Sequence, residues 1–328
     1  MNEVVDIVVD GGGSTTRTGV AISGRLLTST TGPSVNPYSV GKALASRELR
    51  NVLQYAVTKR PKGSTVRAAC LATSAVSDNS TLEDIADAAR TSAAGTPELS
   101  KAEWVVTNDV PPLLLDAAGE LVVVVCGTGT SFVARGADGR VARASGREYL
   151  LSDEGGGFDI GLRGLRAVVR AADGRGPATH LTAAATQLGG SVDAICAMVT
   201  GRDDVKPFVA SFAPNVLVAA TVGDRVARNI VEYAAAELVT GISAVTDSAS
   251  LSPPIRVRMS GSLLVGDHDA LRIALARQVD HDVQLGPVTR SPLELVAAFV
   301  HAVCESSLDV TGVRSVFPFG HYPSVSGR

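Results

Sequence analysis

Two glycine-rich segments of this chain of 328 residues have the composition of phosphate-binding turns. In the first, residues 10–16 read Asp-Gly-Gly-Gly-Ser-Thr-Thr and follow an apolar run at residues 4–9. Glycines allow a sharp turn whose backbone N–H groups point at an anion, and the hydroxyl groups can add hydrogen bonds to it. No lysine follows the glycines, so the segment is neither a Walker loop nor a dinucleotide-binding fingerprint. A plain glycine-rich hairpin turn is the alternative.

The second segment, residues 127–131, reads Gly-Thr-Gly-Thr-Ser and again follows an apolar run, at residues 120–126. A strand, a small-residue turn and a hairpin therefore occur twice, about 115 residues apart, which indicates a duplicated domain rather than a solenoid. Two such turns could face one another and hold one polyphosphate. The residues predicted to contact the phosphates are Gly11, Gly12, Gly13, Ser14, Thr15, Thr16, Gly127, Thr128 and Gly129.

Two carboxylates at predicted strand ends could take part in phosphate chemistry. Asp10 precedes the first glycine turn, where its carboxylate can hold Mg2+ through water. Asp109 ends the sequence Thr-Asn-Asp and can accept a proton from an attacking hydroxyl as a general base. Capping of a helix ahead of Pro111 explains Asp109 as well.

Two further loops carry candidate binding groups. Residues 146–157 place Asp153 beside a second acid and ahead of three glycines, which suits hydrogen bonding to sugar-type hydroxyls or simply an exposed acidic turn. Gly261 and Ser262 follow a strand and leave room for a flat purine against the backbone, although an ordinary strand-to-helix connection has the same composition.

The elements that must position these groups alternate strands with helices in the first part of the chain. A helix is expected from Ser39, with Leu44 and Leu49 on its buried face, and a capping box predicts another from Thr81. Helices dominate after residue 181, and one is expected over residues 292–306. The expected strands lie at residues 4–9, 18–22, 25–30, 66–72, 104–107, 120–126, 131–134, 141–144 and 255–259.

The composition excludes several classes of protein. The net charge of -3 offers no basic surplus for nucleic acid, and the longest apolar runs are too short to span a bilayer. The four cysteines, Cys70, Cys126, Cys196 and Cys304, show no paired spacing and are expected to be reduced core thiols. With no leader apparent at the start, we expect a cytoplasmic protein without nucleic-acid or membrane partners.

Taken in this order and spacing, the segments resemble the N-acetylglucosamine kinase branch of the BadF/BadG/BcrA/BcrD ATPase family, over most of the chain. The family belongs to the superfamily of sugar kinases, actin and heat-shock chaperones. The resemblance implies an α/β fold of two actin-like (ribonuclease H-like) lobes with a nucleotide cleft between them, ATP and Mg2+ as cofactors, and a homodimer. We expect lobes at residues 1–116 and 117–328, with the final helix either in the second lobe or packed back on the first.

The same resemblance implies the roles of particular residues. Asp109 would be the general base, and Gly261 and Ser262 would hold the adenosine. The residues implied to contact the acceptor are Asn36, Asp109, Thr130, Ser131, Gly146, Arg147, Glu148 and Asp153. Family sugar kinases carry a Gly-Trp-Gly sequence in the loop that includes Gly146 and Arg147. Its replacement by charged residues points to a free amino sugar, an aminocyclitol or another charged or more hydroxylated acceptor.

The predicted activity is ATP-dependent phosphorylation of a hydroxyl of a sugar, amino sugar or cyclitol. A sugar- or nucleotide-responsive sensor without catalysis is one alternative. The family's other branch, the ATPase activators that hold an iron–sulfur cluster between two subunits, is the second. Cys126 lies within a buried strand and no suitably placed second cysteine follows, which disfavours the activator.

Overall fold

The computed structural model describes residues 3–13, 15–77, 79–147, 149–202 and 204–305. Two predicted site residues, Ser14 and Glu148, lie outside these described residues. The chain forms two compact units. Unit 1 comprises Met1–Ala118 with Thr289–Arg328, and unit 2 comprises Gly119–Val288. The described residues after Val288, up to Glu305, therefore belong with unit 1.

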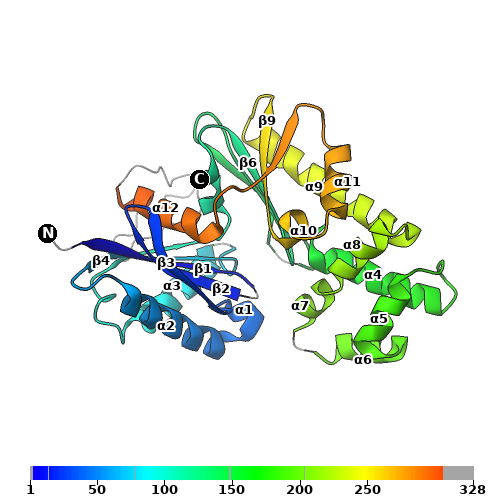
Figure 1. Ribbon diagram of the computed structural model, residues 1–328, viewed down its shortest axis with the longest axis horizontal. Helices are drawn as coiled ribbons and strands as arrows, with labels where there is room; N and C mark the ends of the chain where they lie inside the picture. Colours follow the sequence, from blue (N-terminus) through cyan, green and yellow to red (C-terminus); the bar gives the residue numbers. More distant parts are fainter. Residues whose placement is uncertain (1–2, 14, 78, 148, 203, 306–328) are drawn as a thin grey trace. The chain divides into compact units, whose positions relative to one another are not determined.

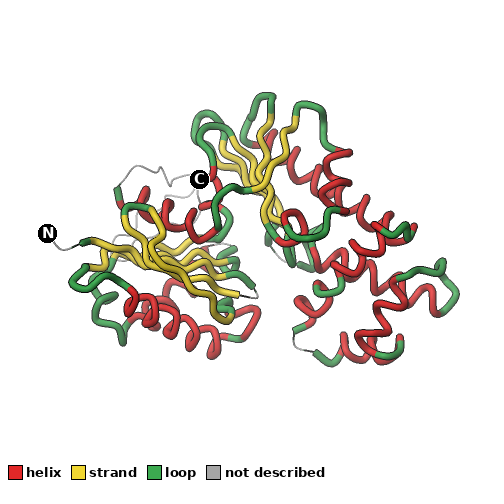
Figure 2. The backbone as a smooth tube through the Cα atoms, in the orientation of Figure 1, coloured by secondary structure: helices red, strands yellow, loops and turns green. Residues whose placement is uncertain are grey.

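Unit 1 is built on a five-stranded sheet with the strand order β3-β2-β1-β4-β5 (Figures 1 and 2). β1 pairs antiparallel with β2 and parallel with β4, and β4 pairs parallel with β5. The carboxyl ends of β1, β4 and β5 therefore meet at one edge of the sheet. The strands span Val4–Gly11 (β1), Thr15–Ile22 (β2), Arg25–Pro33 (β3), Thr65–Thr73 (β4) and Glu103–Thr107 (β5).

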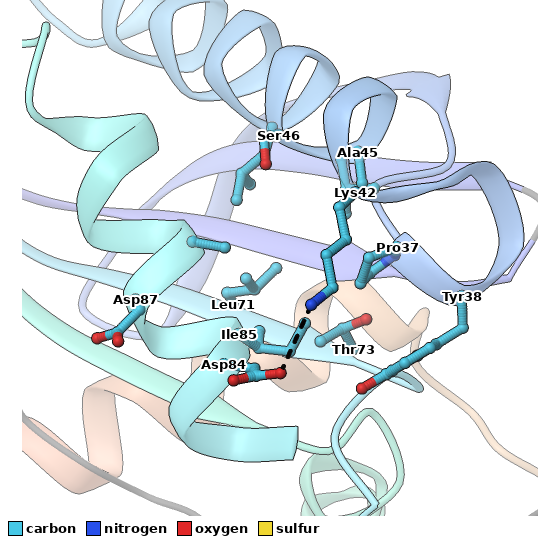
Figure 3. A pocket seen from close by; sticks show the side chains of 13 residues that line it. Pro37, Tyr38, Lys42, Ala45, Ser46, Leu71, Thr73, Asp84, Ile85 and Asp87 are labelled. Atoms are coloured by element: carbon cyan, nitrogen blue, oxygen red, sulfur yellow. Dashed lines mark ion pairs between the residues drawn. The ribbon is translucent and has the colours of Figure 1, made fainter. Parts of the chain in front are cut away.

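Helices cover both faces of this sheet. α2 (Lys42–Lys59) and α3 (Asn79–Ala93) bury one face, and α12 (Pro292–Cys304) buries the other (Figure 1). α12 begins with a capping box in which the Ser291 side chain and Glu294 satisfy each other's backbone N–H groups. A short helix α1 (Pro37–Val40) precedes α2, and a 3-10 helix (Pro111–Asp116) follows β5. A cavity of about 170 Å3 lies between α2 and α3 (Figure 3).

Unit 2 repeats the sheet of unit 1. Its strand order is β10-β9-β6-β7-β8, with β6 antiparallel to β7 and parallel to β9. Read from β8, this order matches that of unit 1, and the two antiparallel strands and the two parallel ones take equivalent places. The duplication predicted from the two glycine turns is therefore present in the topology. The strands span Leu121–Cys126 (β6), Thr130–Arg135 (β7), Val141–Ser145 (β8), Ile255–Ser260 (β9) and Val283–Pro287 (β10).

Helices α4, α8 and α11 pack against α9, whose buried face includes Leu238 and Ile242. The Asp224 side chain caps α9 by accepting a hydrogen bond from the backbone N–H of Ala227 at 2.8 Å. The helices span Gly157–Ala172 (α4), Leu181–Gly189 (α5), Val192–Thr200 (α6), Val205–Ala210 (α7), Ala213–Thr221 (α8), Arg225–Ser248 (α9), Ser262–Val265 (α10) and Ala270–Gln278 (α11).

Several local predictions were wrong in detail. The helix expected from Ser39 is broken at Gly41, and Leu44 is exposed because Ala45 and Leu49 occupy the buried face of α2. α3 begins before Thr81, whose hydroxyl instead accepts the N–H of Ser77. β10 was not predicted.

Two further expectations can be compared with the described residues. Cys196 is exposed rather than a core thiol. None of the described helices is by itself long and apolar enough to cross a bilayer, and Val205–Thr221 with Arg225–Ser248 reach that composition only as a pair bent by 114°.

Candidate functional site

The predicted catalytic and metal-binding carboxylates of unit 1 lie at the same edge of its sheet. In the strand register, Asp10 lies opposite Ala72, and Ala72 lies opposite Thr107. Asp109 follows two residues after Thr107, beyond the end of β5, and is partly exposed. Parallel pairing of β1, β4 and β5 thus brings together two carboxylates that are separated by about a hundred residues of sequence.

Side-chain hydroxyls donate hydrogen bonds to backbone carbonyls of the turn between β1 and β2. The Thr73 hydroxyl donates to the carbonyl of Gly11 at 2.9 Å, and the Ser34 hydroxyl donates to that of Gly12 at 2.9 Å. A Cβ on Gly11 would come within 2.9 Å of the Val35 side chain, so the residue must be small. These bonds hold the backbone carbonyls of Gly11 and Gly12 in place within unit 1.

The turn does not expose all of its predicted phosphate contacts. Gly13 and Thr15 are exposed and Gly12 is partly so. Thr16 is fully buried, and its hydroxyl oxygen accepts the N–H of Val35 at 3.0 Å. The Thr16 hydroxyl therefore stabilises the junction of β2 with the segment after β3 and is not presented to a ligand.

Asp10 is buried, and its nearest cation is the Arg17 guanidinium at 3.4 Å. Burial raises the pKa of Asp10 above its ordinary value, and Arg17 opposes this shift. A buried carboxylate with one half-exposed partner has acceptor capacity left for a cation. No group of three or more His, Cys, Asp or Glu side chains that could hold a metal occurs among the described residues. The one carboxylate of Asp10 fits Mg2+, which is commonly held by one or two carboxylates with water and phosphate oxygens.

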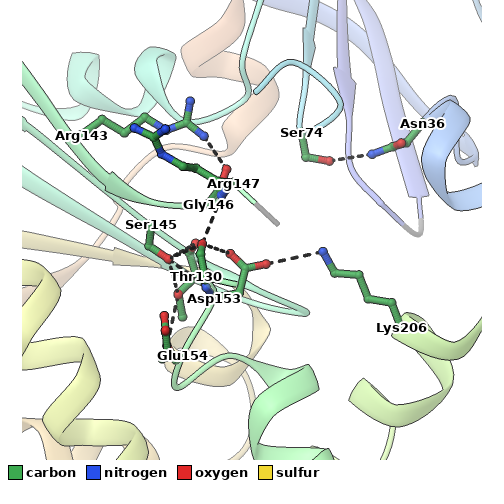
Figure 4. A network of polar contacts seen from close by, with 11 residues as sticks. Asn36, Ser74, Thr130, Arg143, Ser145, Gly146, Arg147, Asp153, Glu154 and Lys206 are labelled. Atoms are coloured by element: carbon green, nitrogen blue, oxygen red, sulfur yellow. Dashed lines mark hydrogen bonds and ion pairs between the residues drawn. The ribbon is translucent and has the colours of Figure 1, made fainter. Parts of the chain in front are cut away.

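Asn36 and Asn108 stand beside this edge in different roles. The Asn36 amide donates to the Ser74 hydroxyl at 3.0 Å (Figure 4). The Asn36 side-chain oxygen caps α1 by accepting the N–H of Tyr38. Asn108 bonds to the carbonyl of Val76 and to the backbone after β5, so it fastens that loop. Asn36 is therefore oriented by two partners, and Asn108 holds the segment that carries Asp109.

The second glycine turn, after β6, is tied to the start of α4. The N–H groups of Gly157 and Phe158 donate to the carbonyls of Gly127 and Thr128, each at 2.8 Å. A Cβ on Gly127 would meet nothing within 4 Å, whereas one on Gly129 would come within 2.1 Å of the Asp153 carboxylate. Gly127 thus faces open space, whereas Gly129 packs directly against the Asp153 carboxylate.

A network of hydroxyls shapes the loop between β8 and α4 (Figure 4). The Ser145 hydroxyl accepts the N–H of Asp153 at 3.1 Å and lies 3.1 Å from that of Thr130. The Ser152 hydroxyl lies 3.3 Å from that of Ser145 and accepts the N–H of Arg147. Thr130 and Ser152 therefore hold the loop in shape.

Asp153 is held in a conformation that aspartate seldom adopts, with φ at 71°. Its carboxylate is buried, and Oδ2 lies 3.5 Å from Nζ of Lys206 on α7. Burial raises the pKa of Asp153, while Lys206 lowers it. The Lys206 ammonium also stands 5.1 Å from the centre of the Tyr149 ring. Strain and burial at one polar side chain are typical of a binding site.

The remaining predicted acceptor contacts of unit 2 differ in exposure. The Ser131 hydroxyl is buried and has no hydrogen-bond partner among the described residues. Gly146, with φ at 65°, fits against Ser131, and its carbonyl accepts from Arg143. Arg147 is exposed. The Ser131 oxygen is closed off from solvent, and leaving such a group unbonded costs about 1–3 kcal/mol.

Only glycine fits the backbone conformation and the close contacts at position 261. Its φ is 88°, and a Cβ would come within 2.2 Å of the carbonyl oxygen of Cys126. Ser262 then opens the short helix α10. The glycine therefore allows β9 to end against the second glycine turn.

Two charged residues of these sites were missed in the sequence. Arg17 lies opposite Asp10 in the β1–β2 hairpin, and strict alternation along β2 could have revealed it. Lys206 is 53 residues from Asp153, on a helix whose packing no local pattern specifies. Each unit thus presents a glycine turn with a buried carboxylate beside it.

Such a duplicated α/β fold, with a small-residue turn after the first strand of each sheet, defines a class of two-unit ATPases and kinases. The family model of the BadF/BadG/BcrA/BcrD ATPase family matches residues 8–304, and the chain belongs to this family.

Two curated relatives are named for a particular kinase activity rather than for the ATPase family. The chain is 32% identical over 194 residues to an N-acetyl-D-glucosamine kinase of Dictyostelium discoideum, covering 56% of this chain and 59% of the relative. It is 30% identical over 141 residues to an N-acetylmuramic acid/N-acetylglucosamine kinase of Clostridium acetobutylicum, covering 40% of this chain and 44% of the relative. The matched segments thus span about half the length of these relatives.

Solved structures show the fold. A candidate N-acetylglucosamine kinase of Chromobacterium violaceum superposes with a TM-score of 0.69 at 24% identity, over 92% of this chain and 99% of that one. A ROK family glucokinase of Streptomyces griseus, solved with glucose and AMPPNP, gives 0.53 at 16% identity, over 90% and 98%. The predicted actin-like α/β fold is confirmed.

Proposed function

We propose that this protein is an ATP-dependent kinase that phosphorylates a hydroxyl of a sugar or amino sugar. Cyclitols are included because the 146–149 sequence departs from that of the family's sugar kinases. The observation that carries the proposal is the alignment of Asp10 and Asp109 at one edge of the unit 1 sheet, beside the first glycine turn. The names of the curated relatives support the same activity.

In the proposed reaction, the acceptor oxygen attacks the terminal phosphorus of ATP and the bond to the bridging oxygen of ADP breaks. The Asp109 carboxylate takes the proton of the attacking hydroxyl. The turns at residues 11–13 and 127–129 would bind phosphate oxygens through backbone N–H groups other than those of Gly12 and Gly127, which donate to the carbonyls of Thr15 and Gly129. Gly261 and Ser262 would contact the adenosine. Asp10 would hold Mg2+, which neutralises phosphate charge when bound.

The acceptor contacts that the resemblance implies are Asn36 and Asp109 in unit 1 and Ser131 and Asp153 in unit 2. Gly146 and Arg147 shape the loop beside them, and Thr130 supports it through its hydroxyl. A homodimer is part of the same proposal, by resemblance.

The experiment that tests the proposal measures ADP release from ATP with a panel of sugars, amino sugars and cyclitols, with product identified by mass. Phosphorylated acceptor formed in step with ADP supports a kinase. Tight ATP binding without turnover of any acceptor contradicts it and favours a sensor.

ADP release without acceptor favours an ATPase activator, the other branch of the family. The cysteines give that branch little support. Cys126 is buried and donates its thiol hydrogen to the carbonyl of Gly155, and burial raises its pKa to about 12. A thiol in this state is poorly suited to ligate a cluster.

A further inference from the structure

The cavity between α2 and α3 in unit 1 has no role in the reaction proposed above. Its volume is about 170 Å3. A dry apolar cavity of about 150 Å3 takes up benzene, so this one accommodates a group of about six non-hydrogen atoms. Its apolar wall consists of Val35, Ala45, Leu49, Leu71, Ile85 and Ala88.

The rim of the cavity carries an ion pair that a ligand can open. Nζ of Lys42 on α2 lies 3.9 Å from Oδ2 of Asp84 on α3, and Tyr38 stands beside them (Figure 3). The two side chains are 83% and 64% exposed, and an ion pair so exposed adds little to stability. Asp87, the second acid of the lining, is already paired with Arg90 at 2.8 Å. Lys42 and Asp84 are therefore the charges that a ligand at the rim would meet.

These two charges restrict the kind of ligand that suits the cavity. An apolar amine would pair with Asp84 but bring its ammonium close to Lys42. An apolar acid would pair with Lys42 but bring its carboxylate close to Asp84. A zwitterion, with an ammonium and a carboxylate on one carbon atom, forms a favourable pair with each residue. An α-amino acid has this head group, and only its apolar side chain has to leave water.

The cavity shares its wall with the first glycine turn. The Thr73 hydroxyl that lines it donates to the carbonyl of Gly11 at 2.9 Å. Val35 lies against Gly11 so closely that a Cβ there would be 2.9 Å from its methyl group. A group that fills the cavity therefore packs on two side chains that contact the turn.

We propose that this cavity binds a free α-amino acid with an apolar side chain, between leucine and phenylalanine in size, and that the bound amino acid favours nucleotide binding at the first glycine turn. The α-ammonium pairs with Asp84, the α-carboxylate pairs with Lys42, and the side chain fills the apolar wall. The effect on the nucleotide rests on the proposed function, whereas the amino-acid site does not. The activity of the protein would then follow the supply of an amino acid as well as that of its substrates.

The first test measures binding of alanine, valine and leucine to the full chain by calorimetry, without nucleotide. Each side-chain carbon that enters the cavity should tighten binding about threefold to fourfold. The analogues 3-methylbutylamine and 4-methylpentanoate each lack one charge of leucine. Each should bind about tenfold more weakly than leucine, because it loses one ion pair and keeps one like-charge contact.

Two rim variants test the assignment of the charges. Asp84→Asn should remove the preference for leucine over 4-methylpentanoate, and Lys42→Met should remove the preference over 3-methylbutylamine. A loss of helix packing would not produce these opposite changes. Glu83→Gln, which alters an exposed acid next to Asp84 and outside the lining, is the matched control and should keep both preferences.

Two further variants fill the cavity from opposite sides, Ala88→Leu on α3 and Ser46→Leu on α2. Both should abolish the gain in affinity with side-chain size, and two are used so that a folding defect in one does not decide the result. Ala43→Leu, at an exposed position of α2 outside the lining, is the matched control and should keep that gain.

The link to the glycine turn has its own measurement. A filled cavity restricts Val35 and Thr73, so the turn loses less freedom when a phosphate binds. With leucine present, a nonhydrolysable ATP analogue should bind about fivefold more tightly, and the analogue should tighten leucine by the same factor. An affinity for the analogue that leucine does not raise would overturn this link.

A gain with side-chain size that both filling variants remove, together with the two changes of preference, supports the site. No binding of leucine to the wild type, equal binding of leucine and its two singly charged analogues, or a gain that survives both filling variants would overturn it. Failure of the proposed function is distinguishable from these outcomes. Phosphorylation of an acceptor by a protein that binds no amino acid refutes only the site, and leucine binding without phosphorylation of any acceptor refutes only the kinase.

Discussion

Nζ of Lys206 lies 3.5 Å from Oδ2 of Asp153, so a lysine on α7 supplies the cation that faces the buried carboxylate of the acceptor loop. Burial raises the pKa of Asp153 and Lys206 opposes the shift. Lys206→Met should therefore raise that pKa further. The carboxylate would then become protonated at a higher pH than in the wild type.

Because a protonated Asp153 accepts sugar hydroxyls less well, the KM for the acceptor should rise as pH falls, beginning at a higher pH in Lys206→Met. We expect an increase in KM of about tenfold, the value of one hydrogen bond to a charged group, with a smaller change in kcat. Lys206→Arg should restore most of the affinity. Identical pH profiles of KM in wild type and Lys206→Met would show that the pair has no part in acceptor binding.

Asp109→Asn should lower kcat by about 10²-fold or more, because an amide cannot take the proton of the attacking hydroxyl. The substitution preserves size, so binding of ATP, measured by calorimetry, should change little. Phosphoryl transfer at nearly the wild-type rate would show that another group is the base.

Gly129→Ala should destabilise unit 2 by about 1–3 kcal/mol and weaken acceptor binding, because its Cβ would displace the Asp153 carboxylate. Gly127→Ala is the matched control for stability, since its Cβ meets nothing within 4 Å. If the turn binds phosphate, Gly127→Ala should weaken ATP binding while leaving the denaturation midpoint nearly unchanged. Equal midpoints for both variants would contradict the close approach at Gly129.

Asp10→Asn separates the stability of unit 1 from its proposed metal binding. The pKa of Asp10 is raised in the folded chain, so the neutral form favours folding. That contribution is complete below the ordinary aspartate pKa and is lost as pH rises through the folded value. Asn cannot ionise, so the variant should unfold at a higher denaturant concentration than the wild type at pH 8, and this difference should shrink towards pH 4.

The same variant should lose the thermal stabilisation that Mg2+ with ATP gives the wild type. A variant that is less stable than the wild type at pH 8 would indicate that the Asp10 carboxylate stabilises the fold. Stabilisation by Mg2+ and ATP that is undiminished would place the metal elsewhere.

Arg67→Met should destabilise unit 1 by about 3–5 kcal/mol, because it leaves the buried carboxylate of Asp6 without a cationic partner. Arg67 bonds to both oxygens of Asp6, at 2.9 and 2.6 Å, and to Glu305 at the end of α12, at 2.7 Å. Glu305→Gln removes only the exposed pair and should cost less than about 1 kcal/mol, measured by denaturant unfolding. Equal losses in the two variants would contradict this division.

The sequence predicted the features that rest on local patterns. The strands β1 to β9, the two turns after β1 and β6 and the helix capped by Ser291 all follow from apolar periodicity, glycine placement and capping residues. Their recurrence also predicted the duplicated sheet. β10 was not predicted because its residues are at most partly buried and show no alternation of apolar and polar side chains.

The parts of the site that the sequence did not predict depend on contacts distant along the chain. Thr16 belongs to the glycine turn in sequence, but the β-strand alternation turns its hydroxyl towards Val35. Lys206 reaches Asp153 only because α7 packs on α4, and the α2–α3 cavity depends on how two helices leave space above β4. No window of neighbouring residues specifies these arrangements.

The return of α12 to unit 1 has a consequence for the order of synthesis. The sheet face that α12 covers, with Val8, Ala21, Cys70 and Val105, is formed from strands translated early, while its cover is translated only after residues 119–288. At typical elongation rates this delay is on the order of 10 s. During that time unit 1 exposes an apolar face on the ribosome, so the nascent chain is a substrate for chaperones until unit 2 is complete.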